Sequence, residues 1–484
     1  MEERKETVVE KKEKKSFSSI NLKSFLLVTI ILGTMLIVGG VLSYIIPQGS
    51  FSRDPDGVII DGTYVEQGVK GIAIWRIITA PFRVFASEDA LTIIFISLFL
   101  LIMSGVFNLL DKTNGIRVII GKTVRKFSKQ RKLVVCIALL AFMAFGSFFG
   151  MFEELVTLLP LVIVFMLSMG MDTLTGLGVC MLGACFGFSA AITNPFSVGI
   201  ASNLAGTYVL QGAWLRILFF VIVFAIVAAF LLLHIRKITN NPEKSYTYAV
   251  DMERRKTLAL QAEAESEEDN RIFKIYAVFF AVQLVMLLLI ASIRVIASYA
   301  IPLLAFSFLI GGIICGCFVC ENKKDVFKYM GQGAVSMLPA VALIALASSI
   351  KLVMTESGIL DTVMYHVIES LRGKDKFLCV VLIYLLTLFL QIFIGSASAK
   401  IMLVMPIILP ICTTLGLSTN IVILTYCMAD GFTDMILPTN PVLLIGLSMA
   451  NVSYDKWVKW TWKLQLLVLA VTLLILFFGV QIAY

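Results

Sequence analysis

Five charged residues lie inside long apolar stretches of the chain: Glu153, Glu154, Lys400, Asp430 and Asp434. A charge at the centre of a bilayer costs at least about 2.5–3.5 kcal/mol, so charged residues within membrane spans are functional candidates by default. Asp430 and Asp434 have the i, i+4 spacing that puts two side chains on one face of a helix. We predict that these two carboxylates form a proton or cation site.

The tripeptide Thr-Asn-Pro occurs twice, at 193–195 and 439–441, and each copy interrupts an apolar stretch. Proline removes a backbone donor and breaks the helix before it, which frees carbonyl groups. These carbonyls and the Thr and Asn side-chain oxygens can coordinate Na⁺ or hold a polar substrate. The half-helix beyond each break attracts carboxylates through its N-terminus. Asn194 and Asn440 are therefore predicted to serve both the substrate and the coupling ion.

The two tripeptides belong to a longer internal repeat. A shift of 246 positions superposes them without a gap and also pairs Gly170 with Gly416. The same shift places Lys400 opposite Glu154. A lysine at that position either binds a substrate carboxylate or neutralises an acidic neighbour, and the sequence leaves both roles open.

Composition identifies the class of protein to which these residues belong. The 484 residues are 59% hydrophobic and only 15% charged, far from the composition of a soluble domain. Apolar runs of about 20 residues, enough to span a bilayer, recur along the chain. The formal net charge is +8, and 28 of the 40 Lys and Arg residues lie in the N-terminal tail (1–23) and in segments 111–132, 236–271, 321–332 and 451–463, as is typical of cytoplasmic segments. We predict a multi-pass cell-membrane protein with a cytoplasmic N-terminus, no nucleic-acid partner, no metal and no cofactor.

Two apolar stretches, 133–169 and 377–416, are too long for one span and too short for two spans with a loop. A re-entrant hairpin with a glycine-containing tip at mid-membrane depth resolves this difficulty. A single long helix whose carboxylates reach water at one end is the alternative for the first stretch. If both stretches return to the side they left, the two halves of the chain are inverted repeats, an arrangement typical of secondary transporters.

The predicted fold is therefore an all-α polytopic membrane protein with an inverted repeat, two re-entrant hairpins and two broken helices. Its predicted parts are a cytoplasmic tail (1–21), a first transmembrane helix with an external loop (22–90), a first repeat (91–235) with hairpin 133–169 and broken helix 174–205, a charged cytoplasmic linker (236–271), and a second repeat (272–484) with hairpin 377–416 and broken helix 420–450.

Several of these segments resemble a known family. They read IIPQGSF at 45–51, GSFFGMFEE at 146–154, GFSAAITNPFSVGIA at 187–201, GSASAKIMLVMPIILP at 395–410, MADGFTDMILPTNP at 428–441 and YDKWVKW at 454–460. The chain resembles the YfcC-like family of the ion transporter superfamily over about residues 20–480. That family is related to the anaerobic C4-dicarboxylate carriers and to basic amino-acid antiporters.

The resemblance implies a scaffold domain and a mobile transport domain that moves as an elevator in each subunit of a homodimer. Relatives place substrate and Na⁺ between the hairpin tips and the broken helices. By matching motifs, the implied site residues are Ser147, Glu153, Glu154, Thr193, Asn194, Ser396, Ser398, Asp430, Asp434, Thr439 and Asn440. With Lys400 added, we assign substrate binding to this set, and coupling to Na⁺ or H⁺ to Asn194, Asp430, Asp434 and Asn440. The motif GSASAK has alanines where relatives are richer in serine and glycine, so it does not carry over a substrate.

The sequence thus predicts a secondary active transporter of a small organic solute. Four acids outnumber the single Lys400, which favours a basic amino acid moved by antiport. A C4-dicarboxylate coupled to Na⁺ or H⁺ is the alternative, because hydroxyls, amides and helix termini also bind carboxylates. A membrane-embedded enzyme is disfavoured, since the chain has no HExxH or GxSxG motif. A passive ion channel remains open on sequence grounds.

Overall fold

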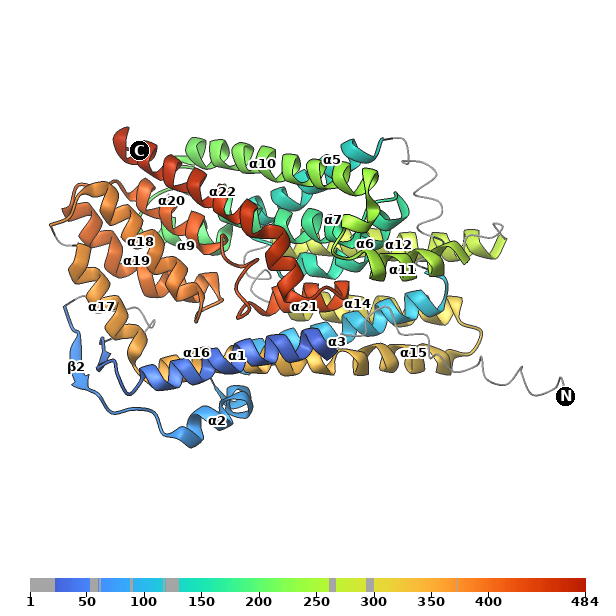
Figure 1. The fold of residues 1–484 in the computed structure, drawn as a ribbon, viewed down its shortest axis with the longest axis horizontal. Coiled ribbons are helices and arrows are strands. Elements are labelled where there is room, and N and C mark those ends of the chain that lie inside the picture. The colour runs from blue at the N-terminus through green and yellow to red at the C-terminus, as the bar shows by residue number, and fades with distance from the viewer. Residues whose placement is uncertain are drawn as a thin grey trace.

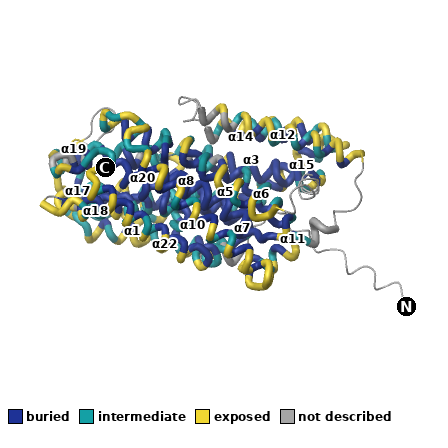
Figure 2. The backbone as a smooth tube through the Cα atoms, turned by 90° about the horizontal axis from the view of Figure 1, so that it is seen from above, coloured by how far each residue is buried: buried dark blue, intermediate teal, exposed yellow. Residues whose placement is uncertain are grey.

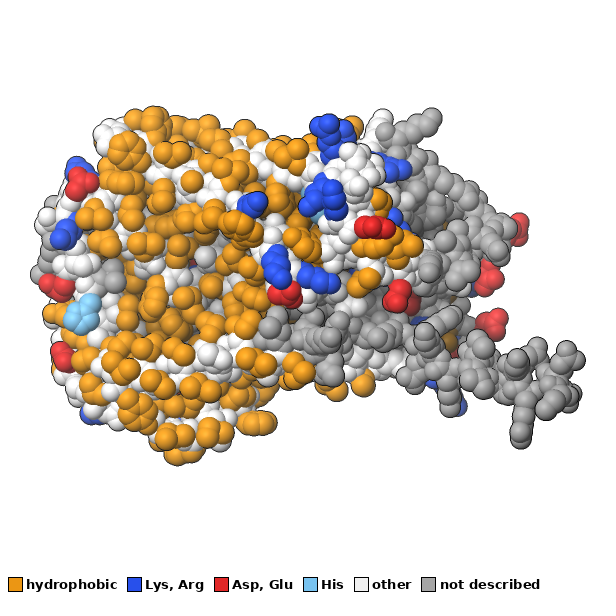
Figure 3. Space-filling model, viewed as in Figure 1, with side chains coloured by type: hydrophobic (Ala, Val, Ile, Leu, Met, Phe, Trp, Pro, Cys, Tyr) orange, Lys and Arg blue, Asp and Glu red, His pale blue; other side chains and the backbone are white. Residues whose placement is uncertain are grey.

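The computed structural model describes residues 22–52, 60, 62–87, 90–115, 118, 130–260, 267–292, 300–371 and 373–484. The predicted tail 1–21 lies outside the described residues. Within the described part, seven helices are long and apolar enough to cross a membrane. A space-filling view shows a broad apolar band, with charged side chains on either side of it (Figure 3). These features agree with an all-α multi-pass membrane protein.

One group of helices forms an elongated layer (Figure 1). It comprises α1 (Leu22–Leu42), α2 (Ile74–Arg83), η1 (Val84–Ala86), α3 (Ala90–Lys112), α12 (Glu267–Ser292), α14 (Ala300–Val319), α15 (Lys323–Ser336) and α16 (Leu338–Glu356). Of these, α1, α3, α15 and α16 lie along one side of the molecule. The strands β1 (Gln48–Ser50) and β2 (Val65–Gly68) pair antiparallel after α1, and α17 (Ile359–Leu371) leads from this layer to the rest of the chain.

The second group contains a wholly buried segment, residues 173–190 (Figure 2). It comprises α5 (Arg131–Ala144), η3 (Phe145–Phe149), η4 (Glu154–Leu158), α6 (Leu159–Ser168), α7 (Thr173–Leu177), η5 (Gly178–Leu182), α8 (Gly183–Ala190), η6 (Pro195–Gly199), α9 (Ile200–Leu204), α10 (Ala213–Asn240), α18 (Lys376–Gln391), α19 (Ala397–Thr414), α20 (Thr419–Asp430), α21 (Pro441–Ala450) and α22 (Tyr454–Gln481). The linker contributes η7 (Pro242–Lys244) and α11 (Tyr248–Leu260).

Three segments expected to be loops are partly helical. Residues 323–336 form α15, which packs closely against α3 because Ser104 and Asn108 donate to backbone carbonyls of α15 at 2.7 Å each. The linker contains α11, and residues 454–463 belong to α22. Helix formation pairs the backbone N–H and C=O groups of these segments, and their charged side chains do not prevent it.

Each of the two long apolar stretches is a helix–turn–helix and not a single helix. The first consists of α5, a turn at 145–153, and then η4 and α6. Its two ends meet, since a Cβ added at Gly170 would lie 3.0 Å from Arg131 Nη1. The second consists of α18 and α19, and there Lys376 Nζ donates to the Gly416 carbonyl at 2.8 Å. In each stretch, the last residue therefore returns to the end of the molecule at which the first residue lies.

Both predicted broken helices are interrupted at the expected tripeptides. The first runs through α7, η5 and α8, ends at Ala191 in the left-handed region (φ 33°), and resumes at Pro195. The second ends at Asp430 and resumes at Pro441. The span that contains the first break is wholly buried over its most apolar window. Backbone that leaves the helix is tolerated at such depth only where protein or a polar cavity surrounds it.

Candidate functional site

The tip of the first hairpin lies directly against the first helix break. Ser147 Oγ accepts a hydrogen bond from the Ile192 amide at 3.0 Å, and the Ser147 carbonyl accepts one from the Thr193 amide at 3.2 Å. Thr193 Oγ1 donates to the Phe148 carbonyl at 2.9 Å. Three hydrogen bonds therefore join the hairpin tip to the broken helix, so the two are expected to move together.

Asn194 caps the half-helix that begins at Pro195. Its Oδ1 accepts from the Phe196 amide at 2.9 Å, which satisfies one of the donors left open at a helix N-terminus. A glycine is required opposite it, because Gly150 has φ 68° and a Cβ there would lie 2.3 Å from Asn194 Oδ1. The hairpin tip is thus shaped around this asparagine.

Asn440 plays the corresponding role at the second break. Its Oδ1 accepts from the Val442 amide at 2.8 Å, two positions further on, as at Asn194. Its Nδ2 donates to Asp434 Oδ1 at 2.7 Å, and Gln391 Nε2 donates to the same oxygen. The described hydrogen bonds to the buried Asp434 carboxylate therefore come from two neutral amides.

Asp430, four residues earlier, has a cationic partner instead. Lys400 Nζ donates to Asp430 Oδ1, and both side chains are almost wholly buried. Of the two roles left open for Lys400, the structure favours neutralisation of an acidic neighbour.

The two breaks are held side by side. Cys185 Sγ, near the end of α8, donates to the Gly431 carbonyl at 2.8 Å, and Ser189 Oγ donates to the Met428 carbonyl at 2.8 Å. A Cβ added at Gly431 would lie 2.5 Å from the Ser189 amide nitrogen, so only glycine permits this approach. The tip of the second hairpin joins the same region, where Tyr426 Oη donates to the Ala397 carbonyl at 2.9 Å.

Six of the thirteen buried side-chain polar atoms that have no hydrogen-bond partner in the described part of the chain lie around these breaks. They are Asn194 Nδ2, Ser197 Oγ, Gln391 Oε1, Asp430 Oδ2, Thr433 Oγ1 and Thr439 Oγ1. Leaving a buried donor or acceptor unsatisfied costs about 1–3 kcal/mol each. So many such atoms in one region indicate that a polar ligand, an ion or water completes the site.

The structure brings most of the predicted site residues to the two breaks, but not all in the same way. Ser147, Asn194, Lys400, Asp430, Asp434 and Asn440 are buried there, and Thr193 and Thr439 are half-buried. Ser398 is half-buried and Ser396 exposed, both at the second hairpin tip. Glu153 is half-buried beyond the first hairpin turn, and the Glu154 side chain lies outside the described atoms.

Sequence reasoning missed three polar residues of this region. Gln391 stands alone in the apolar run of α18, which is a signal that the sequence offers. Ser197 and Thr433 lie within a few residues of Asn194 and Asp434 but belong to no repeated motif. Their burial became evident only from the packing of the breaks.

A second buried polar network lies where the linker meets the first broken helix. Asp172 caps α7, and its two oxygens accept from Thr175 (amide, 2.9 Å; hydroxyl, 2.6 Å), from Ser245 Oγ at 2.6 Å and from His234 Nε2 at 2.8 Å. Trp460 Nε1 donates to His234 Nδ1 at 3.1 Å. Because an indole N–H only donates, His234 Nδ1 is the acceptor of this hydrogen bond, and Nε2 is the ring nitrogen that donates to Asp172.

Asp251 of α11 extends this network. It accepts from the Thr173 amide at 3.1 Å, from the Thr173 hydroxyl and from Thr247 Oγ1 at 2.6 Å. Arg254 donates to Thr173 Oγ1 at 3.0 Å and to the Met449 carbonyl at 3.5 Å. α11 thereby joins the start of the first broken helix to the end of the second.

Burial and hydrogen bonding act in opposite directions on the acids of this network. Burial works to raise the pKa of Asp172, but hydrogen bonds from His234, Ser245 and Thr175 lower that pKa below its ordinary value. For Asp251, burial prevails and raises the pKa despite the hydrogen bonds from Thr173 and Thr247. Burial lowers the pKa of Arg254 to about 10, with Asp251 opposing, so its guanidinium stays charged at neutral pH.

Comparison with known proteins identifies the family of the chain. The family model described as the C4-dicarboxylate anaerobic carrier matches residues 23–481. The chain is 26% identical over 410 residues to an uncharacterized protein of Haemophilus influenzae, covering 83% of this chain and 77% of that one. It is 25% identical over 379 residues to the Escherichia coli protein named "Putative basic amino acid antiporter YfcC", covering 76% and 74% respectively.

Two solved structures are similar over nearly their full length. The YdaH transporter of Alcanivorax borkumensis is 17% identical with a TM-score of 0.43, over 95% of this chain and 98% of that one. MtrF of Neisseria gonorrhoeae, described among a class of antimetabolite efflux pumps, is 16% identical with a TM-score of 0.41, over 94% of each chain.

Proposed function

The chain belongs to the C4-dicarboxylate anaerobic carrier family and is a secondary transporter of a small solute, and from this premise we propose that it exchanges basic amino acids. The observation that carries this proposal is the Asp434 carboxylate. It is buried, and the hydrogen bonds described for it come from the neutral amides of Gln391 and Asn440. An ionised carboxylate in such surroundings needs a positive charge.

Charge counting supports a substrate with a net positive charge. Lys400 neutralises Asp430, so Lys400, Asp430 and Asp434 together carry one net negative charge. The ammonium or guanidinium group of a basic amino acid, a proton or a Na⁺ ion would each balance it. The relative in Escherichia coli whose name includes basic amino acid antiporter is consistent with the first choice.

The proposed mechanism is an elevator movement. The two hairpin tips and the two breaks form one connected unit through Ser147, Cys185, Ser189 and Tyr426. The helices of the elongated layer would form the scaffold, and this unit with α10 and α22 the transport domain. We propose that the two halves are inverted repeats and that each protomer of a homodimer, in the cell membrane with its N-terminus cytoplasmic, moves its own transport domain.

A C4-dicarboxylate is the second candidate substrate, with Na⁺ or H⁺ as coupling ion. Asn194 and Asn440 each cap a half-helix whose N-terminus points into the region of unsatisfied polar atoms. Such N-termini attract carboxylates. The family description names the same class of solute. In this case the cation at Asp434 would be the coupling ion.

Counterflow in proteoliposomes tests the proposal. Vesicles preloaded with unlabelled arginine or ornithine receive trace labelled solute, with and without Na⁺, and succinate-loaded vesicles run in parallel. We expect arginine or ornithine exchange that is lost in Asp434→Asn. Asp455→Asn is the matched control, because Asp455 is an exposed carboxylate on α22.

The opposite result is equally clear. Succinate uptake that requires Na⁺ and Lys400, with no exchange of arginine or ornithine, would replace the amino-acid proposal by the dicarboxylate one. Uncoupled conductance without saturable exchange would contradict a carrier altogether.

A further inference from the structure

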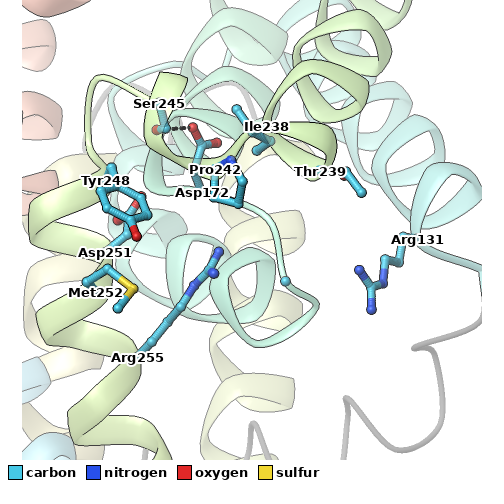
Figure 4. A pocket seen from close by; sticks show the side chains of 11 residues that line it. Arg131, Asp172, Ile238, Thr239, Pro242, Ser245, Tyr248, Asp251, Met252 and Arg255 are labelled. Atoms are coloured by element: carbon cyan, nitrogen blue, oxygen red, sulfur yellow. Dashed lines mark hydrogen bonds between the residues drawn. The ribbon is translucent and has the colours of Figure 1, made fainter.

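A cavity of about 200 Å³ lies away from the helix breaks, at the open end of the first hairpin (Figure 4). Its walls come from the first residue of α5, the turn before α7, the end of α10, and α11. Arg131 and Arg255 line it together with Asp172, Ser245, Tyr248 and Asp251. Figure 4 shows the two guanidinium groups reaching in from two different elements, below Asp172 and Ser245.

The two carboxylates that line this cavity already accept hydrogen bonds from neighbouring residues. Asp172 accepts four hydrogen bonds, which is the number that the lone pairs of a carboxylate allow. Asp251 accepts three, from Thr173 and Thr247. A cationic ligand would therefore find almost no acceptor there.

The cavity still offers donors. Arg255 Nη2 donates to the Met171 carbonyl at 2.7 Å, whereas its Nε is buried and has no partner among the described residues. An arginine carries five N–H donors in a fixed fork that matches oxyanions. Arg131 brings a second guanidinium to the same space. Donors in excess of acceptors select a ligand that accepts hydrogen bonds and carries negative charge.

The volume of the cavity and the positions of its donors indicate which class of anion it can bind. A volume of about 200 Å³ leaves room for a phosphate group. A carboxylate presents two oxygens in one plane, while a phosphate presents oxygens in several directions and can meet two guanidinium groups from different sides.

We propose that this cavity binds a phosphate group, as a free small anion or as the head of an anionic lipid, between Arg131 and Arg255. The bound phosphate would fasten the open end of the first hairpin to α11. This inference does not depend on the identity of the transported solute, because the cavity and the helix breaks have no lining residue in common.

Binding is tested with purified full-length protein in uncharged detergent. Inorganic phosphate is titrated at constant ionic strength with chloride as the balancing anion, and the unfolding midpoint and binding heat are recorded. We expect phosphate to raise the midpoint, and Arg255→Gln and Arg131→Gln to weaken binding about tenfold or more, as for loss of a charge-assisted donor group. Arg236→Gln, an exposed arginine of α10 outside the cavity, should bind as the wild type does.

Nanodiscs of phosphatidylcholine with or without phosphatidic acid separate the two sources of phosphate. Stabilisation by phosphatidic acid that vanishes in Arg131→Gln, without a response to free phosphate, assigns the site to a lipid head. Arg131→Gln changes an exposed residue and keeps the test valid if Arg255→Gln fails to fold. No response to either probe, or an equal response in all variants, would overturn the proposal.

Discussion

The two buried polar regions of the molecule treat their carboxylates in opposite ways. Next to the linker, Asp172 accepts four hydrogen bonds and its partner His234 is itself held by Trp460. At the helix breaks, Asp430 Oδ2 has no partner among the described residues, and neighbouring hydroxyl and amide groups are unsatisfied as well. Fully hydrogen-bonded carboxylates such as Asp172 are typical of structural networks, whereas unsatisfied buried acceptors such as Asp430 Oδ2 indicate that a ligand, an ion or water completes the site.

Among the variants that test this contrast, Lys400→Met is expected to have the largest effect on stability. Removing one partner of a buried ion pair leaves the other charge uncompensated and costs about 3–5 kcal/mol. The unfolding midpoint in detergent should therefore fall strongly. Lys400→Met combined with Asp430→Asn should recover much of that loss. If the double variant is no more stable than the single one, Lys400 does not act through Asp430.

The same Asp→Asn exchange should have opposite consequences in the two regions. Asp434→Asn keeps an oxygen for the donors Gln391 and Asn440, so we expect a folded protein whose solute exchange is at least about 100-fold slower, the loss of one essential charge contact. Asp172→Asn turns an N–H group toward existing donors. It should lower stability by about 2–3 kcal/mol, and the protein that stays folded should still exchange solute.

Counterflow and thermal unfolding, measured on both variants, decide the matter. A stable but inactive Asp172→Asn, or an active Asp434→Asn, would break the distinction between a structural and a functional network.

A smaller difference is expected between the two capping asparagines. Asn194→Ala and Asn440→Ala each remove one helix cap and should each cost about 1 kcal/mol of stability. Asn440→Ala also removes a donor to Asp434, so it should impair exchange more than Asn194→Ala does. Equal impairment would indicate that Asp434 does not depend on its amide partners.

The smallest expected effect concerns how Asp172 and Asp251 of the linker network make the free energy of unfolding depend on pH. Asp172 and Asp251 share an ordinary pKa of 3.8 and are shifted in opposite directions. Below pH 3.8 the unfolded chain binds more protons at Asp172 than the folded one, so stability lost there as pH falls should be absent in Asp172→Asn. Above pH 3.8 the folded chain holds the proton of Asp251 longer, so stability falls as pH rises through the raised pKa, except in Asp251→Asn.

Unfolding midpoints of the wild type and both variants from pH 3 to pH 7 check this prediction. Identical slopes for the two variants would contradict the opposite shifts.

Much of the fold could be predicted from the sequence. The apolar stretches and the two Thr-Asn-Pro tripeptides gave the broken helices to within one residue at each end. Each long stretch forms two helical segments joined by a turn, as a hairpin requires, and its re-entry into the membrane stays a prediction. The segments 321–332 and 451–463 were predicted to be cytoplasmic from their basic residues, and this placement stays a prediction; the structure adds that both are largely helical, in α15 and in the first turns of α22.

The linker network escaped prediction for a different reason. Asp172 and His234 are 62 positions apart and Asp172 and Ser245 are 73 apart. None of these three residues belongs to a motif, and each alone is an ordinary polar residue at or just beyond the end of an apolar stretch. Their combination exists only because α10 and α11 fold back onto the start of α7.

The sequence by itself determined which segments are apolar, where proline interrupts them, and which charged residues had to be accommodated among them. These properties depend on neighbours within a few positions, which is the range over which hydropathy and helix breaking act. Only the tertiary structure decided which acid is neutralised. Lys400 meets Asp430 across 30 positions, and Gln391 meets Asp434 across 43. That choice depends on how the second hairpin packs against the second break, and it leaves Asp434 with the amides of Gln391 and Asn440 as its described hydrogen-bond partners.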